Sequence, residues 1–310
     1  MKKVVSTTQD ITALGGLSTE AVDERYAQID VLSVAELAAL MNEADATVPL
    51  AVRAAFRDIV PALEAAAMRV RLGGRLVYVG AGTPGRIGVL DASEVPPTFG
   101  TEPGRVLAII AGGSDAVISS IEGAEDDRAA GAASVDENEI VSQDVVVALA
   151  SSGRTPFVLG AVERARERGA LTVGMSCNKK TPLSALAEYP IEVLVGPEIV
   201  SGSTRLKAGT AQKLVLNMFS TISMVQSGKT YGNLMVDVSA TNVKLKERAT
   251  RIVQTVAGVD REAACGALEA TGYDVKVAIV TLRTGADPDD AKARLESANG
   301  RLRDILDVAQ

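Results

Sequence analysis

Five short apolar runs constrain the fold of this chain more than any other feature of its sequence. The runs are residues 76–79, 106–110, 145–149, 171–175 and 191–195. Each is continuous instead of alternating, which is typical of strands buried on both faces of a sheet. Helical patterns such as residues 156–168 separate the runs, and strand–helix–strand connections form parallel sheets with right-handed crossovers. The sequence therefore predicts an α/β fold with a doubly wound, five-stranded parallel sheet.

Helical patterns flank the predicted sheet on both sides. A capping box at Ser33 and Glu36 begins one helix. A second helix begins after Thr47 and is expected to kink or restart at Pro61. Beyond the sheet, a long helix is expected at about residues 207–226.

The last part of the chain is predicted to be mainly helical. Capping residues at Asn242, Asp260 and Asp287 each precede an amphipathic pattern, whereas residues 275–282 fit either a strand or a helix. Three regions are therefore expected. They are an N-terminal helical segment at 1–61, a sheet domain at 62–228, and a connection with a small helical domain at 229–310.

Composition excludes several classes of site. The chain has no histidine, two cysteines and a formal net charge of −7. Without imidazole there is no Ser-His-Asp triad and no histidine-based zinc site, and Cys177 and Cys265 lie too far apart for a local metal pair. The acidic balance argues against a nucleic-acid partner, and no secretory or membrane-spanning run is recognisable. We expect a cytoplasmic protein without membrane contact, metal or cofactor, whose proton chemistry uses carboxylates or other non-imidazole groups.

Two similar loops follow the first and third apolar runs. Residues 80–86 read G-A-G-T-P-G-R, and residues 150–156 read A-S-S-G-R-T-P. Each loop leads into a helix, where backbone N–H groups and hydroxyls can bind an anion at the carboxyl edge of the sheet. The pair favours a phosphate-bearing small molecule as ligand.

The first loop also matches the dinucleotide-binding pattern G-x-G-x-x-G. That pattern needs an acidic residue after the second strand, but Asp115 comes too late, whereas Asp91 and Glu94 come too early. The glycines can equally serve only to make a tight strand-to-helix turn. Dinucleotide binding is therefore the weaker interpretation.

Two acidic segments lie after these strands. Residues 91–94 read D-A-S-E and precede V-P-P, so Glu94 is expected where the first helix ends, near the mouth of the first loop. Residues 122–127 read E-G-A-E-D-D. Both segments can be solvated helix turns, or they can supply the general acid and base that a histidine-free site requires.

A third polar segment, residues 201–210, precedes the long helix and reads S-G-S-T-R-L-K-A-G-T. It can serve only as a helix cap with Lys207 on the surface. Alternatively, its hydroxyls and its lysine can bind a phosphorylated sugar at the start of the helix.

Taken together, these motifs resemble one family, the N-acetylmuramic acid 6-phosphate etherases of the sugar-isomerase (SIS) superfamily. The resemblance extends from about residue 18 to about residue 253, in order and with natural spacing. The segments that carry it are GAGTPGRIGVLDASE (80–94), EGAED (122–126), SGRTP (152–156), GSTRLKAGTAQK (202–213) and GNLMVDV (232–238).

The resemblance implies cleavage of the D-lactyl ether of N-acetylmuramic acid 6-phosphate to N-acetylglucosamine 6-phosphate and D-lactate. Elimination from the ring-opened aldehyde comes first, and water then adds to the unsaturated intermediate. A base must take the C2 proton, and an acid must protonate the ether oxygen as lactate leaves. By the family's motifs Glu94 is the acid and Glu125 the base, although these two roles could be reversed.

The resemblance also implies which positions bind the phosphosugar. They are Thr83, Gly85, Ser151, Ser152, Gly153 and Thr155, with Ser203, Thr204 and Lys207 as weaker candidates. Two residues depart from the family's usual pattern, since Pro84 stands where a serine is common and Val95 where a cysteine is common. Because SIS domains commonly pair with their sites near the interface, a homodimer is expected.

Other functions remain possible at this point. A non-catalytic phosphosugar sensor of the glucokinase-regulator type would keep the phosphate loops but would not need both glutamates. This chain keeps Glu94 and Glu125, which favours the enzyme. An aldose–ketose isomerase of the same fold and a dinucleotide-dependent oxidoreductase are further alternatives. The E-G-A-E-D segment disfavours the isomerase, and the misplaced acidic residues disfavour the oxidoreductase.

Overall fold

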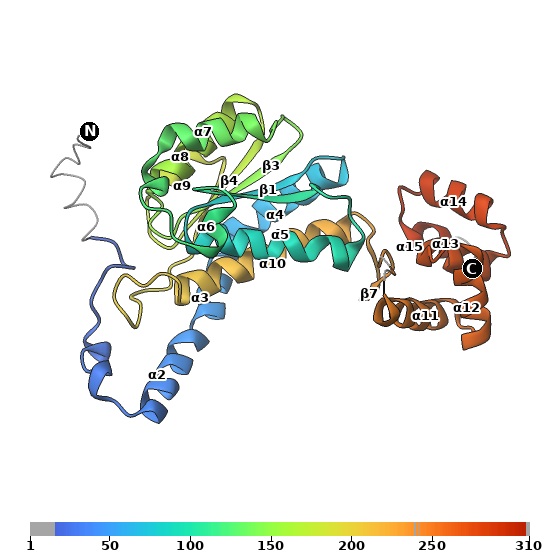
Figure 1. The fold of residues 1–310 in the computed structure, drawn as a ribbon, viewed down its shortest axis with the longest axis horizontal. Helices are drawn as coiled ribbons and strands as arrows, with labels where there is room; N and C mark the ends of the chain where they lie inside the picture. The colour runs from blue at the N-terminus through green and yellow to red at the C-terminus, as the bar shows by residue number, and fades with distance from the viewer. Residues whose placement is uncertain (1–15, 239, 241, 308–310) are drawn as a thin grey trace. The chain divides into compact units, whose positions relative to one another are not determined.

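The computed structural model describes residues 16–238, 240 and 242–307 (Figure 1). Two compact units make up the chain. The first combines the residues up to Ala92 with Val106–Phe219, and the second combines Ser93–Arg105 with the residues from Ser220 onwards. The three predicted regions, with boundaries at 61 and 228, stay a prediction.

A five-stranded parallel sheet forms the centre of the first unit and confirms the predicted fold class. The strand order is β2-β1-β3-β4-β5. The strands are β1 (Leu76–Gly80), β2 (Val106–Ile110), β3 (Val145–Leu149), β4 (Leu171–Ser176) and β5 (Tyr189–Glu192). Since every residue of β1 and β3 is buried, their unbroken apolar sequences match their surroundings.

The fifth strand begins and ends earlier than the predicted run at 191–195. The backbone N–H of Val193 still donates to the carbonyl of Ser176 at 2.9 Å, but Leu194 is exposed, and Gly196 then takes a left-handed conformation with φ of 70°. The chain therefore leaves the sheet at the point where the sequence predicted continued pairing.

Helices cover both faces of the sheet. Figure 1 shows α7 (Arg128–Glu137) and α8 (Pro156–Glu167) on one face, with α5 (Thr83–Phe99) and α10 (Lys207–Gln226) on the other. The remaining helical elements of this unit are η1 (Glu24–Tyr26), η2 (Ile29–Val31), α2 (Val34–Ala46), α3 (Val48–Ala54), α4 (Phe56–Arg71), α6 (Asp115–Ile118), η3 (Ala124–Asp126) and α9 (Pro182–Leu186).

A buried polar network holds α5 and α10 on the same face. The hydroxyl of Tyr78 on β1 donates to the Asp91 carboxylate of α5 at 2.6 Å. The same carboxylate accepts a hydrogen bond from the side-chain amide of Asn217 on α10. Because both of its carboxylate oxygens accept hydrogen bonds, Asp91 can be buried.

Pro61 does not start a new helix. The helical region that begins after Thr47 breaks earlier, at Ala55 between α3 and α4, and Pro61 lies inside α4. The turns after Pro61 are anchored by buried alanine, leucine and valine side chains, which outweigh the hydrogen bond that proline removes.

Besides the last turns of α5 and α10, the described residues of the second unit form a short hairpin and five helices. Residues 275–282, which fit either a strand or a helix, are helical because Asp274 caps the N–H of Val277. Asn242, Asp260 and Asp287 cap helices as predicted. The elements are β6 (Thr230–Tyr231), β7 (Leu234–Met235), α11 (Val243–Ala257), α12 (Arg261–Ala270), α13 (Val275–Thr284), α14 (Pro288–Ser297) and α15 (Leu302–Leu306).

The hairpin was missed within the segment predicted to be a connection. Nearby, the buried ammonium group of Lys276 donates to Asp237 at 2.6 Å and to the carbonyl of Gly300 at 2.8 Å. This contact fixes the segment after the hairpin against α13. Within the described residues, no helix combines the length and the apolar character that a membrane crossing requires.

A buried carboxylate fixes the base of the sheet. Asp144, directly before β3, accepts hydrogen bonds from the guanidinium of Arg75 at 2.7 Å and from the N–H groups of Arg75 and Val141 at 2.9 and 3.0 Å. Burial opposes its ionisation, but these hydrogen bonds outweigh burial and hold the pKa of Asp144 below its usual value.

We predict that Asp144→Asn lowers the free energy of unfolding by about 2 kcal/mol at neutral pH. Because the folded-state pKa is depressed, the ionised carboxylate stabilises the fold fully above about pH 4, and this contribution is lost as the pH falls through the lowered pKa. Urea unfolding at several pH values should show the gap between variant and wild type closing in acid. Asp290→Asn, which breaks a surface ion pair, is the control and should cost little. A gap that does not change with pH would contradict the assignment.

Candidate active site at the carboxyl edge of the sheet

The two glycine- and serine-containing loops follow adjacent strands, as the sequence predicted. β1 pairs with β2 on one side and with β3 on the other. The connections from these strands therefore diverge to opposite sides of β1. In open α/β sheets, ligands bind outside the carboxyl ends of the strands where this reversal occurs. The fold thus brings residues 80–86 and 150–156 to the edge where a site is expected.

Glycines allow β1 to pass directly into α5. A Cβ at Gly85 would lie 2.6 Å from the side chain of Ile110 and 2.9 Å from the carbonyl oxygen of Gly80. Between them, Gly82 has a φ of +58°, which favours glycine. The G-x-G-x-x-G pattern is therefore accounted for by a tight strand-to-helix turn, without a dinucleotide.

Pro84 fits this turn because it is the second residue of α5. The N–H groups of a helix's first turn have no partner within the helix, so proline there breaks no hydrogen bond. The first turn keeps the N–H groups of Thr83 and Gly85 as donors, while the serine hydroxyl common in the family is absent.

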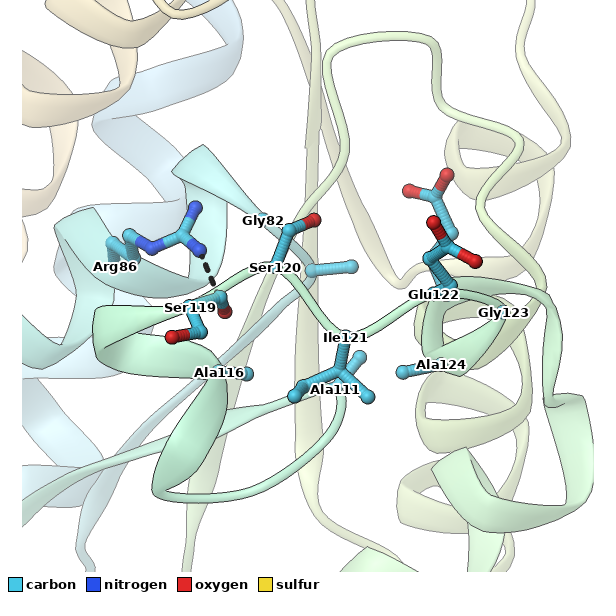
Figure 2. A pocket seen from close by; sticks show the side chains of 12 residues that line it. Gly82, Arg86, Ala111, Ala116, Ser119, Ser120, Ile121, Glu122, Gly123 and Ala124 are labelled. Atoms are coloured by element: carbon cyan, nitrogen blue, oxygen red, sulfur yellow. Dashed lines mark hydrogen bonds between the residues drawn. The ribbon is translucent and has the colours of Figure 1, made fainter.

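A cavity of about 320 Å³ opens beside this turn (Figure 2). The loop after β1 forms one wall, and the segment between β2 and α7 forms the other. Its lining residues are Ala81, Gly82, Arg86, Ala111, Ala116, Ser119, Ser120, Ile121, Glu122, Gly123, Ala124 and Glu125. Of the two predicted catalytic glutamates, Glu125 lines the cavity.

Glu125 owes its position to a short turn of helix. It lies on η3, which follows Gly123 with a left-handed φ of 72°. Its neighbour Asp127 caps α7 by accepting the N–H of Ala130 at 2.8 Å, so that carboxylate has a structural task. Glu125 and Glu122 are both exposed at the cavity. This wall of the cavity therefore carries two exposed carboxylates, Glu122 and Glu125, that could accept a proton from a ligand.

Arg86 forms part of the opposite wall and was not selected from the sequence. Its guanidinium donates to the carbonyl of Val117 at 3.0 Å and to the carbonyl of Ser119 at 3.2 Å. Figure 2 shows Arg86 and Glu122 on opposite sides of the cavity. Arg86 thus holds the segment after α6 in place. Its position directly after Gly85, in the loop that follows β1, is the sequence feature that could have identified it as a site residue.

Glu94 is not where the sequence predicted. α5 does not end there but continues to Phe99, because Pro96 and Pro97 lie in its last turn while Val95 and Phe99 are buried. Glu94 follows Thr83 by eleven residues, and at the rise of an α-helix this is about 16 Å along the axis. It is exposed and does not line the cavity. The expected position near the loop mouth was therefore wrong.

The loop after β3 is fixed by buried amide groups. The carbonyl of Ser151 accepts the side-chain amide of Asn178 at 2.9 Å and the N–H of Cys177 at 3.0 Å. Its hydroxyl accepts the side-chain amide of Gln212 at 3.0 Å. Neither Asn178 nor Gln212 was selected from the sequence, because a lone buried amide has no distinctive spacing.

The other predicted residues of this loop lie at the start of α8. Ser152 accepts the N–H of Arg154 at 3.2 Å, and Gly153 has a φ of +67° in a position where a Cβ would clash with Thr181. Thr155 precedes α8, but its hydroxyl does not cap the helix. These residues do not line the cavity beside Glu125, although they follow the adjacent strand.

The start of α10 excludes one of the two alternatives left open for Lys207. The residue does not lie on the surface but is buried, and its ammonium group donates to the carbonyl of Val195 at 2.8 Å. The carboxylate of Glu198 accepts the N–H groups of Lys207 and Ala208 at 3.0 and 2.9 Å. Burial lowers the pKa of Lys207, and the nearby Glu198 opposes this shift. An internal anion therefore already caps this helix, and neither Lys207 nor its neighbours Ser203 and Thr204 line the cavity.

Two family models and many curated proteins match this chain. A sequence model of the SIS domain matches residues 114–222, and one of the glucokinase regulatory protein N-terminal SIS domain matches residues 58–166. The N-acetylmuramic acid 6-phosphate etherase of Rubrobacter xylanophilus is 54% identical over 93% of this chain and 96% of its own length. That of Streptomyces avermitilis is 54% identical over 94% of both chains. The chain belongs to this etherase family. A phosphoheptose isomerase structure from Francisella tularensis is 17% identical, with a TM-score of 0.49 over 63% of this chain and 100% of its own.

Proposed function

We propose that this chain cleaves the D-lactyl ether of N-acetylmuramic acid 6-phosphate, and that it does so as a carbon–oxygen lyase by elimination followed by hydration. The observation that carries the proposal is the placement of Glu125 at a cavity walled by the loop after β1, in a chain of the etherase family. The products are N-acetylglucosamine 6-phosphate and D-lactate.

Glu125 is assigned as the base for the C2 proton. That proton becomes acidic only when C1 is an aldehyde, so the sugar reacts in its ring-opened form. A carboxylate on an exposed turn beside the cavity is a group that can accept this proton directly. Because the lactyl oxygen leaves from C3, the enolate formed at C2 expels it once that oxygen is protonated.

The phosphate is assigned to the two loops that follow β1 and β3. The first turn of α5 offers the N–H groups of Thr83 and Gly85, and the loop before α8 offers the hydroxyls of Ser151, Ser152 and Thr155. Gly153 lets this loop turn tightly. Ser203, Thr204 and Lys207 are less suited to this role, because the Glu198 carboxylate already accepts the N–H groups at the N-terminus of α10.

Glu94 is assigned as the acid that protonates the leaving lactate. Its exposure and its distance from the first turn of α5 suggest that a second copy of the chain completes the site. On α4, Phe56 and Val60 lie one turn apart and are 42 and 43% exposed, and this apolar pair offers a surface that a second copy can cover. We place the protein in the cytoplasm, where this phosphosugar would be available to it.

Replacing Glu125 tests the base assignment. We predict that Glu125→Gln slows exchange of the C2 proton with solvent deuterium by at least ~100-fold, because the amide cannot accept the proton. Glu122→Gln is the matched control, since Glu122 lines the same cavity and is equally exposed. Its exchange rate should stay close to that of the wild type. Wild-type exchange in Glu125→Gln would remove that residue from the base role.

Replacing Glu94 tests the acid assignment separately. Glu94→Gln should lose D-lactate release but keep some C2 exchange, since proton abstraction does not require protonation of the leaving group. Both reactions can be followed in one sample by proton NMR. Glu137→Gln, at an exposed helical position in α7 that does not line the cavity, serves as the control. Full lactate release by Glu94→Gln would be incompatible with its role as the acid.

A further inference from the structure

Gln212 is a fully buried amide at the edge of the candidate site. It lies in the second turn of α10, and its Nε2 donates to the Ser151 hydroxyl oxygen at 3.0 Å. In this contact the serine hydroxyl accepts, so its own proton is left to donate elsewhere. Among the described residues, no group accepts the proton of the Ser151 hydroxyl.

The other end of the same amide is unsatisfied. Gln212 Oε1 is buried and has no hydrogen-bond partner within the described part of the chain. If the amide were reversed, Oε1 could accept the Ser151 proton, but the two Nε2–H groups would then lose that oxygen as an acceptor. The two orientations therefore have opposite effects. The observed one frees the serine proton for a ligand, whereas the reversed one would consume it.

Gln212 lies on a helix that contacts both loops assigned to the phosphate. Gly209, one turn earlier on α10, lies against Thr83, whose Cγ2 would be 3.5 Å from a Cβ on that glycine. On the other side, Asn178 holds the carbonyl of Ser151 and also donates to the Thr19 hydroxyl at 3.0 Å. The backbone of Ser151 is thus fixed independently of Gln212. The amide of Gln212 is left to control the direction of the hydroxyl.

We propose that Gln212 is a positioning residue that orients the Ser151 hydroxyl as a hydrogen-bond donor to the phosphate of the bound sugar. This inference rests on the proposed function, because it takes the loop after β3 as part of the phosphosugar site. Gln212 acts through Ser151 and does not touch the substrate, since its free oxygen is inaccessible to solvent.

A double-mutant cycle tests this dependence. Gln212→Met removes both amide groups at similar volume and should weaken binding of N-acetylglucosamine 6-phosphate roughly 10-fold, the effect of one hydrogen bond to a charged group. KM should rise by a similar factor with kcat changed less than about two-fold, because only binding of the phosphate is affected. In a Ser151→Ala background, Gln212→Met should have no further effect.

Two further variants separate an effect on the Ser151 hydroxyl from a general effect on folding. Gln212→Glu should weaken binding more than Gln212→Met, because a carboxylate there accepts the serine proton and repels the phosphate. Ser223→Ala, a buried position farther along α10, should leave binding unchanged. Thermal unfolding of each variant separates a folding defect from a binding defect.

The outcomes distinguish this proposal from the proposed function. The positioning role would be overturned if Gln212→Met lowered the affinity for the sugar phosphate equally in the wild-type and Ser151→Ala backgrounds. Unchanged affinity in Gln212→Met would overturn it as well. The cycle is measured by calorimetric titration with the sugar phosphate, so it does not depend on catalysis. If the wild type binds the sugar phosphate but releases no lactate, the proposed activity fails while the cycle still decides the role of Gln212.

Discussion

The close approach of β1 and α5 is the contact on which the candidate site depends. Gly80 and Gly85 touch with no room for a Cβ on either, so the helix begins at the very end of the strand. This places the N–H groups of the first turn at the carboxyl edge of the sheet and puts Arg86 on the cavity wall. From there Arg86 holds the segment that leads to Glu125. A larger residue at either glycine would move all of these groups together.

Buried polar side chains determine which helix N-termini at this edge still have unpaired N–H groups that a ligand can use. α10 is closed by the carboxylate of Glu198, which takes the place of an external anion. α8 begins at Pro156 without a side-chain cap, and the Thr155 hydroxyl before it is not used for capping. Of these two helix starts, that of α8 therefore has no side-chain cap among the described residues. We accordingly propose Ser152 and Thr155 ahead of Ser203 and Thr204 as ligands of the phosphate.

Burial on both faces made the sheet predictable, because continuous apolar runs such as those of β1 and β3 have few other uses. Side chains whose surroundings come from distant parts of the chain were not predictable. A surface position for Lys207 stayed open from the sequence, because nothing local shows that Val195 and Glu198 will surround the start of its helix. Glu94 was expected near the loop because two prolines usually end a helix, whereas buried Val95 and Phe99 keep α5 helical. Gln212 carries no local signal, since its importance lies in a contact with Ser151 across 61 positions.

The proposed activity is elimination of lactate, with Glu125 as the base at this edge and Glu94 as the acid, followed by addition of water. The most direct measurement is D-lactate release from N-acetylmuramic acid 6-phosphate by the purified protein in ¹⁸O-labelled water. We expect D-lactate without ¹⁸O and N-acetylglucosamine 6-phosphate with ¹⁸O at C3, because the C3–O bond breaks and water adds to that carbon. Binding of the phosphosugar without release of lactate would contradict the account and would favour a sensor that uses the same fold.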